Sequence, residues 1–199
     1  EDYDTELFVI VYPSEDPDNN DSISLTIDEF NEVGYVEGSD WTELDPEEDL
    51  KDQWNYQKKR NKEIIANGGS PINKIEWHIT PKYNSSKGYV FSSTKLYFEN
   101  GNITYNTFLY ILGRNGYQFI NVIFSEDNSS YVTQEFINQI VDSFKYNPGM
   151  GYGDFQEGDN IAKTSAKDLI SAPKEKELNI FIPEDYLCSN AISARKGSK

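Results

Sequence analysis

An acidic turn near the start of the chain has the residue types of a calcium site. Asp16, Asp18 and Asn20 stand at alternate positions in the stretch SEDPDNND, and Asp21 follows. Ca²⁺ prefers carboxylate and carbonyl oxygens, and an EF-hand loop also needs Gly at position 6 and Glu at position 12. Counted from Asp16, those positions hold Asp21 and Ile27, so an EF-hand is excluded. The turn-forming residues favour a solvated turn, and the alternative is a looser calcium site with the ligands Asp16, Asp18, Asn20 and Asp21.

Apart from its carboxylates, the chain has few residues of the types that catalysis or metal binding needs. The chain has one cysteine, Cys188, and one histidine, His78, which excludes an internal disulfide, a cysteine-rich zinc site and a two-histidine metal site. No nucleophile elbow or phosphate-binding loop accompanies His78. We therefore expect no enzymatic activity, no catalytic residue and no cofactor, with calcium as the alternative. A hydrolase using two carboxylates also stays open, although no spacing marks such a pair among the 34 acidic residues.

The segment LGRNGY (112–117) offers a third kind of site. It places Arg114 beside a tight turn at one end of a predicted sheet, and a guanidinium group can hold a carboxylate at two points. Asp154 and Asp159 are the candidate partners, in a loop after the second long helix. We expect Arg114 to fasten that loop to the hairpin. The alternative is a surface for a ligand or partner, with the residues Tyr105, Asn106, Arg114, Tyr152, Asp154 and Asp159.

The charge of the chain is large and unevenly distributed. The formal net charge is −16, and the first 50 residues contain 18 acidic residues and no Lys or Arg. A nucleic-acid partner and an anionic membrane surface are both disfavoured, because each needs a basic face. The longest apolar runs, such as LFVIVY (7–12), are too short to cross a bilayer. The expected partner is therefore a protein or a small molecule of unknown identity.

Hydrophobic periodicity predicts the elements that position these residues. Alternation and turn residues predict strands at 7–12, 22–30, 72–80, 87–101, 102–113 and 116–124, and a last strand at LNIFIP (178–183). In the third of these, Ile75, Trp77 and Ile79 are expected to face inward and His78 outward. Apolar stripes and caps predict helices from Asp45 to the glycines at 68–69, over 131–146, and a short one near 160–171.

These elements indicate an α+β fold, with a mainly antiparallel sheet of five to seven strands and two main helices packed on it. We expect a single domain over 1–183 and a C-terminal tail at 184–199, and leave open whether 1–30 is the remnant of an upstream segment. The order strand–strand–strand–helix at 87–146 resembles the PsbP/Mog1-like α/β sandwiches. That likeness concerns the fold and implies no function.

A series of short motifs resembles a bacterial family of unknown function, usually described as predicted membrane-anchored proteins. The motifs occur in order over about residues 30–172: GYV (34–36), DW (40–41), RNKE (60–63), Trp77, Pro81 and Tyr83, TYNT (104–107), LGRNGY (112–117), FKYNPG (144–149) and YGDFQEGDNIA (152–162). The resemblance implies an export signal, an extracytoplasmic domain and a C-terminal membrane helix. This chain shows neither the signal nor, after Ile170, an anchor helix, so we expect a soluble relative or the soluble part of a longer protein.

Taken with the resemblance, the residues favour a non-enzymatic extracytoplasmic binding or scaffold domain of a bacterial envelope protein. The two alternatives are a carboxylate-based hydrolase and a calcium-dependent adhesion module that uses the acidic N-terminal third.

Overall fold

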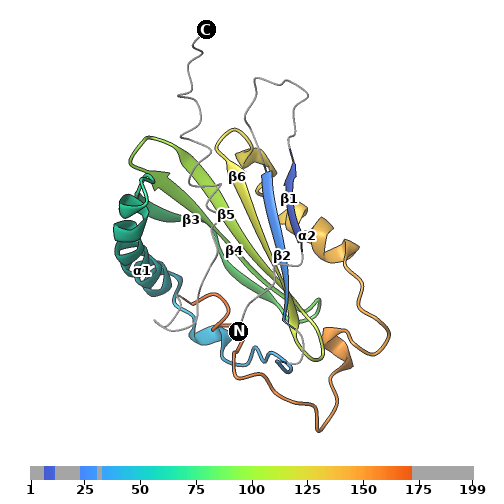
Figure 1. Ribbon diagram of the computed structural model, residues 1–199. Coiled ribbons are helices and arrows are strands. Elements are labelled where there is room, and N and C mark those ends of the chain that lie inside the picture. Colours follow the sequence, from blue (N-terminus) through green and yellow to red (C-terminus); the bar gives the residue numbers. More distant parts are fainter. Residues whose placement is uncertain (1–6, 12–22, 31–32, 172–199) are drawn as a thin grey trace.

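The computed structural model describes residues 7–11, 23–30 and 33–171 (Figure 1). Six strands form one antiparallel sheet in the order β1-β2-β6-β5-β4-β3. They are β1 (Leu7–Val11), β2 (Ile23–Phe30), β3 (Ile72–Asn84), β4 (Tyr89–Phe98), β5 (Ile103–Leu112) and β6 (Tyr117–Ser125). The helices are α1 (Pro46–Ala66) and α2 (Gln134–Ser143), with short 3₁₀ turns η1 (Trp41–Glu43), η2 (Ser129–Tyr131) and η3 (Tyr152–Asp154). The α+β class, the sheet and the two main helices are as predicted.

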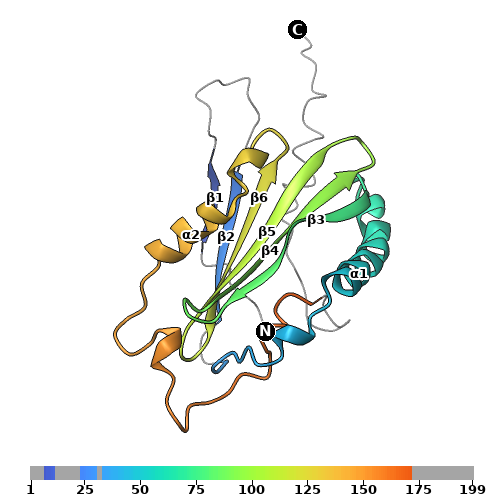
Figure 2. The same ribbon diagram turned by 180° about the vertical axis from the view of Figure 1, so that it is seen from behind.

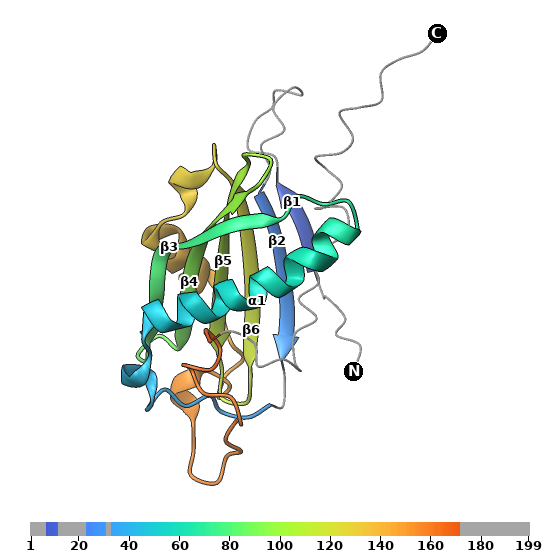
Figure 3. The same ribbon diagram turned by 90° about the vertical axis from the view of Figure 1, so that its left-hand side faces the viewer.

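The two helices lie on opposite faces of the sheet, and each face has its own core. Figure 2 shows α2 on one face, where Ile137 and Val141 pack on the alternate, inward residues of β4, β5 and β6. Figure 3 shows α1 running obliquely across the other face, where it packs chiefly against β3. On the α1 face a second cluster is built on Val90, Leu112 and Tyr152. Alternate residues of one strand therefore belong to different cores.

Both helices begin at side chains that satisfy their first backbone amides. The Asp45 carboxylate accepts hydrogen bonds from the amides of Glu47 and Glu48, at 3.0 and 3.3 Å, and the hydroxyl of Thr133 accepts one from the Phe136 amide at 3.2 Å. Such caps stabilise a helix start by about 1 kcal/mol. The Asp45 start agrees with the prediction, whereas α2 is shorter than the predicted 131–146.

Asn61, a polar residue on the inward side of α1, is satisfied by the backbone. Its amide nitrogen donates to the Ile72 carbonyl at 2.6 Å, and its amide oxygen accepts from the Ile72 amide at 3.1 Å and from Gln57 at 3.0 Å. These bonds fix the end of α1 to the start of β3, so Asn61 joins two elements rather than lining a pocket.

The predicted alternation in β3 is wrong, because the strand contains irregularities in its register with β4. One of these falls between Trp77 and Ile79. Trp77 consequently packs into the cluster on the α1 face, and Ile79 into the core under α2. A bulge places two successive residues on one side and reverses the pattern beyond it.

His78 is exposed, its Nε2 lies 3.1 Å from the Val132 carbonyl, and its ring meets Tyr105 edge-on at 4.7 Å.

The predicted short helix near 160–171 is also wrong. Residues 165–171 form hydrogen-bonded turns, in which the Leu169 amide donates to the Ser165 carbonyl and the Ser171 amide to the Lys167 carbonyl. The expected strand at 178–183, the tail at 184–199 and the calcium ligands Asp16, Asp18, Asn20 and Asp21 lie outside the described residues. Within the described part, no helix has both the length and the apolar character needed to span a membrane.

Candidate functional site

Three regions far apart in the sequence meet at one end of the sheet, the lower end in Figure 1. Residues 33–40 run beside 160–166: Tyr35 forms a parallel bridge with Ile161, and its amide donates to the Asn160 carbonyl at 2.8 Å. The turn after β5 joins the same assembly, because Gly113 bridges Gly151. Four of the nine family motifs, GYV, DW, LGRNGY and YGDFQEGDNIA, fall at least partly in these segments, so this end of the sheet is the candidate site.

Arg114 fastens the loop after α2 to the β5–β6 turn. Its Nε and Nη2 donate to the two carboxylate oxygens of Asp159, at 2.8 and 2.7 Å, and its Nη1 donates to the Gly149 carbonyl at 3.4 Å. A two-point pair of this kind fixes orientation as well as charge. The Arg114 and Asp159 side chains expose 24% and 18% of their surface. Hydrogen bonds from Arg114 and from the Gln156 amide hold the pKa of Asp159 below its usual value.

Asp154, the other candidate partner of Arg114, has a different role. Its carboxylate accepts a hydrogen bond from the Gly151 amide at 2.8 Å and closes the turn η3. The structure therefore brings Arg114, Asp154, Asp159 and Tyr152 to one end of the sheet, with Asp159 as the partner of Arg114.

Tyr152 is the centre of this end of the molecule. Its hydroxyl donates to the Val36 carbonyl at 2.8 Å and lies 2.8 Å from the Tyr83 hydroxyl, and its ring stacks on Tyr35 at 4.6 Å. Gly88 passes so close that a Cβ there would lie 2.4 Å from the Tyr152 Cβ. Burial raises the pKa of the Tyr152 hydroxyl far above its usual value, so it remains a neutral donor. Tyr152 thus connects the 33–40 segment, β3 and the loop after α2.

Tyr105 and Asn106 do not belong to this assembly. Both lie near the far end of β5, about 25–30 Å from Arg114 at ~3.3 Å per residue. As successive residues of a strand, they face opposite sides of the sheet. Tyr105 is buried in the core under α2, whereas Asn106 points to the α1 face. The predicted grouping of Tyr105 and Asn106 with Arg114 is therefore wrong. Although these residues are close in sequence, the length of β5 separates them from Arg114.

The same end of the sheet exposes large apolar side chains. Of the six that are exposed in the described part of the chain, four come from its loops: Val33, Met150, Phe155 and Ile161, with 39%, 41%, 40% and 40% of their surface exposed. We call these four residues the end surface. Phe155 packs on Tyr35 at 4.3 Å, Tyr35 bridges Ile161, and the Met150 carbonyl accepts from the Arg114 amide at 3.0 Å.

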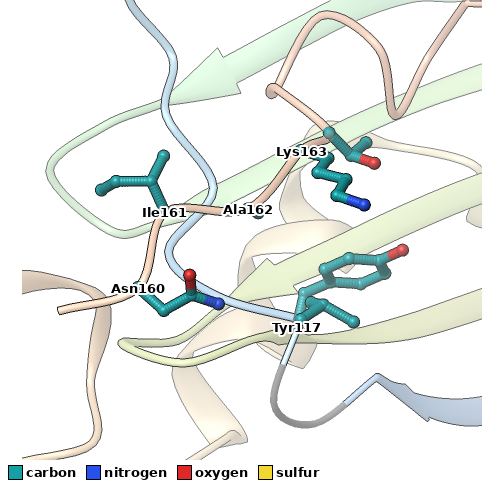
Figure 4. Close-up of a pocket in the computed structure, with 7 residues that line it drawn as sticks. Tyr117, Asn160, Ile161, Ala162 and Lys163 are labelled. Atoms are coloured by element: carbon teal, nitrogen blue, oxygen red, sulfur yellow. The ribbon is translucent and has the colours of Figure 1, made fainter.

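A partly enclosed hollow of about 430 Å³ lies beside the end surface. In Figure 4, the segment from Asn160 to Lys163 forms one side of the hollow and Tyr117 the other. Two members of the end surface also line it: Val33 and Ile161. The hollow therefore adjoins the end surface at Val33 and Ile161.

The acidic residues of the predicted site have structural roles. Asp154 and Asp159, the acidic residues of the predicted site, are both held by structural hydrogen bonds. No group of His, Cys, Asp and Glu suited to a metal ion occurs among residues 7–11, 23–30 and 33–171. The sequence reasoning missed Val33, Met150, Phe155 and Ile161. The signal in the sequence was the presence of apolar residues in loops that are rich in glycine, asparagine and acidic residues. A loop that only connects two elements would be expected to be polar.

The fold defines an α+β protein in which one antiparallel sheet is covered by a helix on each face, with an apolar surface at one end. Residues 2–179 match a family model described as protein of unknown function (DUF2167), and the chain belongs to this family. No curated protein matches the chain.

Removing the charge of Asp159 is expected to destabilise the protein in a pH-dependent way. The folded state lowers the pKa of Asp159, so its contribution is present above the unfolded value, about 3.9, and is lost as the pH falls through the folded pKa. Urea titrations should show Asp159→Asn less stable than the unsubstituted chain at pH 7, with a difference that shrinks below about pH 4. Asp142→Asn, at an exposed pair with Lys87, is the control and should change little. If the difference in the free energy of unfolding between Asp159→Asn and the unsubstituted chain stayed constant down to pH 2.5, the ion pair of Asp159 with Arg114 would be contradicted.

Proposed function

We propose that this chain is a non-enzymatic, extracytoplasmic binding domain of a bacterial envelope protein, and that it binds a protein partner through the end surface. The observation that carries the proposal is the gathering of Val33, Met150, Phe155 and Ile161 at one end of the sheet. Single exposed apolar residues are ordinary, but a group on ordered loops marks an interaction site. A protein partner is favoured over a small molecule because the adjoining hollow is only partly enclosed, whereas small-molecule sites enclose most of their ligand.

The loops that carry the end surface are held as a rigid platform. The Arg114–Asp159 pair, the Tyr152 hydroxyl and the Tyr35–Ile161 bridge each connect the loops that carry the exposed side chains to a neighbouring segment. A preorganised surface loses less conformational entropy on binding than a mobile one. These contacts are made by residues of the motifs GYV, LGRNGY and YGDFQEGDNIA, whose role would be to hold the binding loops in place.

The hydrolase alternative receives no support from the acidic residues of this site. A glycosidase-like pair needs one carboxyl group whose pKa is raised and a second one across a cleft. Asp159 has its pKa shifted in the opposite direction by Arg114. Asp49, whose pKa is raised by burial, lies in α1 beside Ser171 and away from the hollow.

The binding role is tested by affinity isolation from the bacterium that makes the protein, with two matched variants. Phe155→Asp places a charge in the end surface. Tyr131→Asp places one on a somewhat more exposed aromatic residue in η2, outside the end surface. A protein retained by the unsubstituted chain and by Tyr131→Asp, but lost from Phe155→Asp, is the expected result. Equal retention by all three chains would overturn the assignment of the end surface.

The calcium-dependent alternative is tested by melting the protein with excess Ca²⁺, with Mg²⁺ and with chelator. Its ligands, Asp16, Asp18, Asn20 and Asp21, come between β1 and β2 in the sequence and lie outside the described residues, and we expect them to form a solvated turn. A chain of charge −16 should then respond equally and weakly to both ions. A bound ion at about 100 times its Kd would add roughly 2.7 kcal/mol. A Ca²⁺-selective rise in Tm, lost in Asp16→Asn with Asp18→Asn, would favour the adhesion module instead.

A further inference from the structure

Three exposed carboxylates lie around Phe155, the aromatic member of the end surface. Asp154 and Glu157 belong to the same loop, one residue before Phe155 and two residues after it. Glu37 comes from a distant segment and stands two residues after Tyr35, whose ring packs on Phe155 with the centroids 4.3 Å apart. Residues two apart in an extended segment face the same side, so Glu37 lies on the side of Tyr35 that meets Phe155.

Two of the cations at this end of the sheet are already paired with carboxylates of the fold. Arg114 is bound by Asp159 at 2.7 Å, and the Nζ of Lys167 lies 3.3 Å from the carboxylate of Glu43. Among residues 7–11, 23–30 and 33–171, none of the three carboxylates around Phe155 is in an ion pair. Their negative charges are therefore available to a partner.

The loops that form this end of the molecule have a negative balance of charge. The segments 33–45 and 144–171, with Arg114, carry eight acidic and four basic residues, a formal balance of −4. Lys145 and Lys163 are exposed, but they do not offset this excess of carboxylates. Several charges of one sign on one surface attract groups of the opposite sign and repel those of the same sign. An acidic partner is therefore disfavoured.

We propose that the partner presents a lysine or arginine beside an apolar side chain, with the apolar side chain on the end surface and the cation between the ring of Phe155 and the carboxylates of Glu37 and Glu157. Protein interfaces commonly have an apolar centre and a polar rim. A guanidinium group can pair with a carboxylate and stack on an aromatic ring. Complementary charge adds specificity and speeds association. This inference rests on the proposed function, because it names the chemistry of the partner at the same surface.

Selection of short random-sequence peptides displayed on phage tests the inference. Peptides selected on the unsubstituted chain should carry Lys or Arg next to apolar residues and should not bind Phe155→Asp. A chain with Glu37→Lys and Glu157→Lys should lose these peptides and select peptides with Asp or Glu instead. The matched control is Glu126→Lys with Asp127→Lys, at two exposed acidic residues beyond the opposite end of β6. The control should select the same peptides as the unsubstituted chain.

The outcomes separate this inference from the proposed function. Peptides that depend on Phe155 but have no excess of Lys and Arg, or that still bind the charge-reversed chain, would overturn the inference and leave the proposed function standing. If no peptide is selected, or if Phe155→Asp retains the selected peptides equally, both the inference and the assignment of the end surface fail.

A second pair of substitutions guards against a change in the fold. Glu37 and Glu157 are exposed, so their substitution should leave the Tm of the protein unchanged. Glu37→Gln with Glu157→Gln removes the two charges without reversing them, and should weaken binding of a selected peptide about fivefold. An unchanged affinity in this variant would contradict the role of the two carboxylates, even if the charge-reversed chain failed to fold.

Discussion

Replacing Gly34 with alanine is expected to lower the free energy of unfolding by about 3 kcal/mol, because the new side chain is both strained and overpacked. Gly34 has a φ of +102°, and a Cβ there would lie 2.7 Å from the Ala162 nitrogen, 2.8 Å from the Ile161 carbonyl carbon and 2.9 Å from the Asn160 oxygen. All three atoms are backbone and cannot turn away. The two segments would have to separate, and the bridge between Tyr35 and Ile161 would be lost.

Gly101→Ala is the matched control for this variant. Gly101 also has a positive φ, +90°, but a Cβ there would meet nothing within 4 Å. Its substitution should therefore lower the free energy of unfolding only by the conformational penalty, about 1–2 kcal/mol. Chemical denaturation of the two variants measures the difference. Equal losses would show that residues 33–36 and 160–162 are not packed together as described.

Truncation of Tyr152 has the second large expected effect. Tyr152→Ala should cost about 3–5 kcal/mol, as for other large aromatic residues removed from a core. It removes the ring stacked on Tyr35 and leaves the Val36 carbonyl without the Tyr152 hydroxyl. Tyr152→Phe keeps the ring and removes only the hydroxyl, so its expected cost is about 1–2 kcal/mol.

Thermal melts and urea titrations of both variants test the central position of Tyr152. Tyr131 has half of its surface exposed, so Tyr131→Ala serves as the control and should stay within about 0.5 kcal/mol of the unsubstituted chain. If Tyr152→Ala were no more destabilising than Tyr131→Ala, Tyr152 would not connect the 33–40 segment to the loop after α2.

The sheet was predictable because its signals are local. Alternating apolar residues marked β4, β5 and β6, and Asn115-Gly116 marked the turn between the last two, where the Gly113 amide donates to the Gly116 carbonyl at 2.8 Å. The start of α1 followed from Asp45 and Pro46. The contact of Arg114 with Asp159 followed from charge complementarity and from the position of each residue beside a predicted turn.

What the sequence could not indicate depends on tertiary contacts. Nothing local marks the irregularity between Trp77 and Ile79, which sends them to different faces. Residues 160–171 have a helix-like pattern, but pairing of Ile161 and Ala162 with Tyr35 holds part of this segment extended. The end surface could not be foreseen, because it joins loops more than 100 residues apart in sequence: Val33 and the loop of Met150, Phe155 and Ile161.

A photo-crosslinking amino acid at position 155, compared with the same substitution at position 131, tests the binding role of the end surface most directly. Both positions are exposed aromatic residues, but only Phe155 belongs to the end surface. In the cells that make the protein, the proposed function predicts one discrete adduct with another protein from position 155 and none from position 131. Adducts of equal yield from both positions, or none from position 155, would contradict binding through this surface.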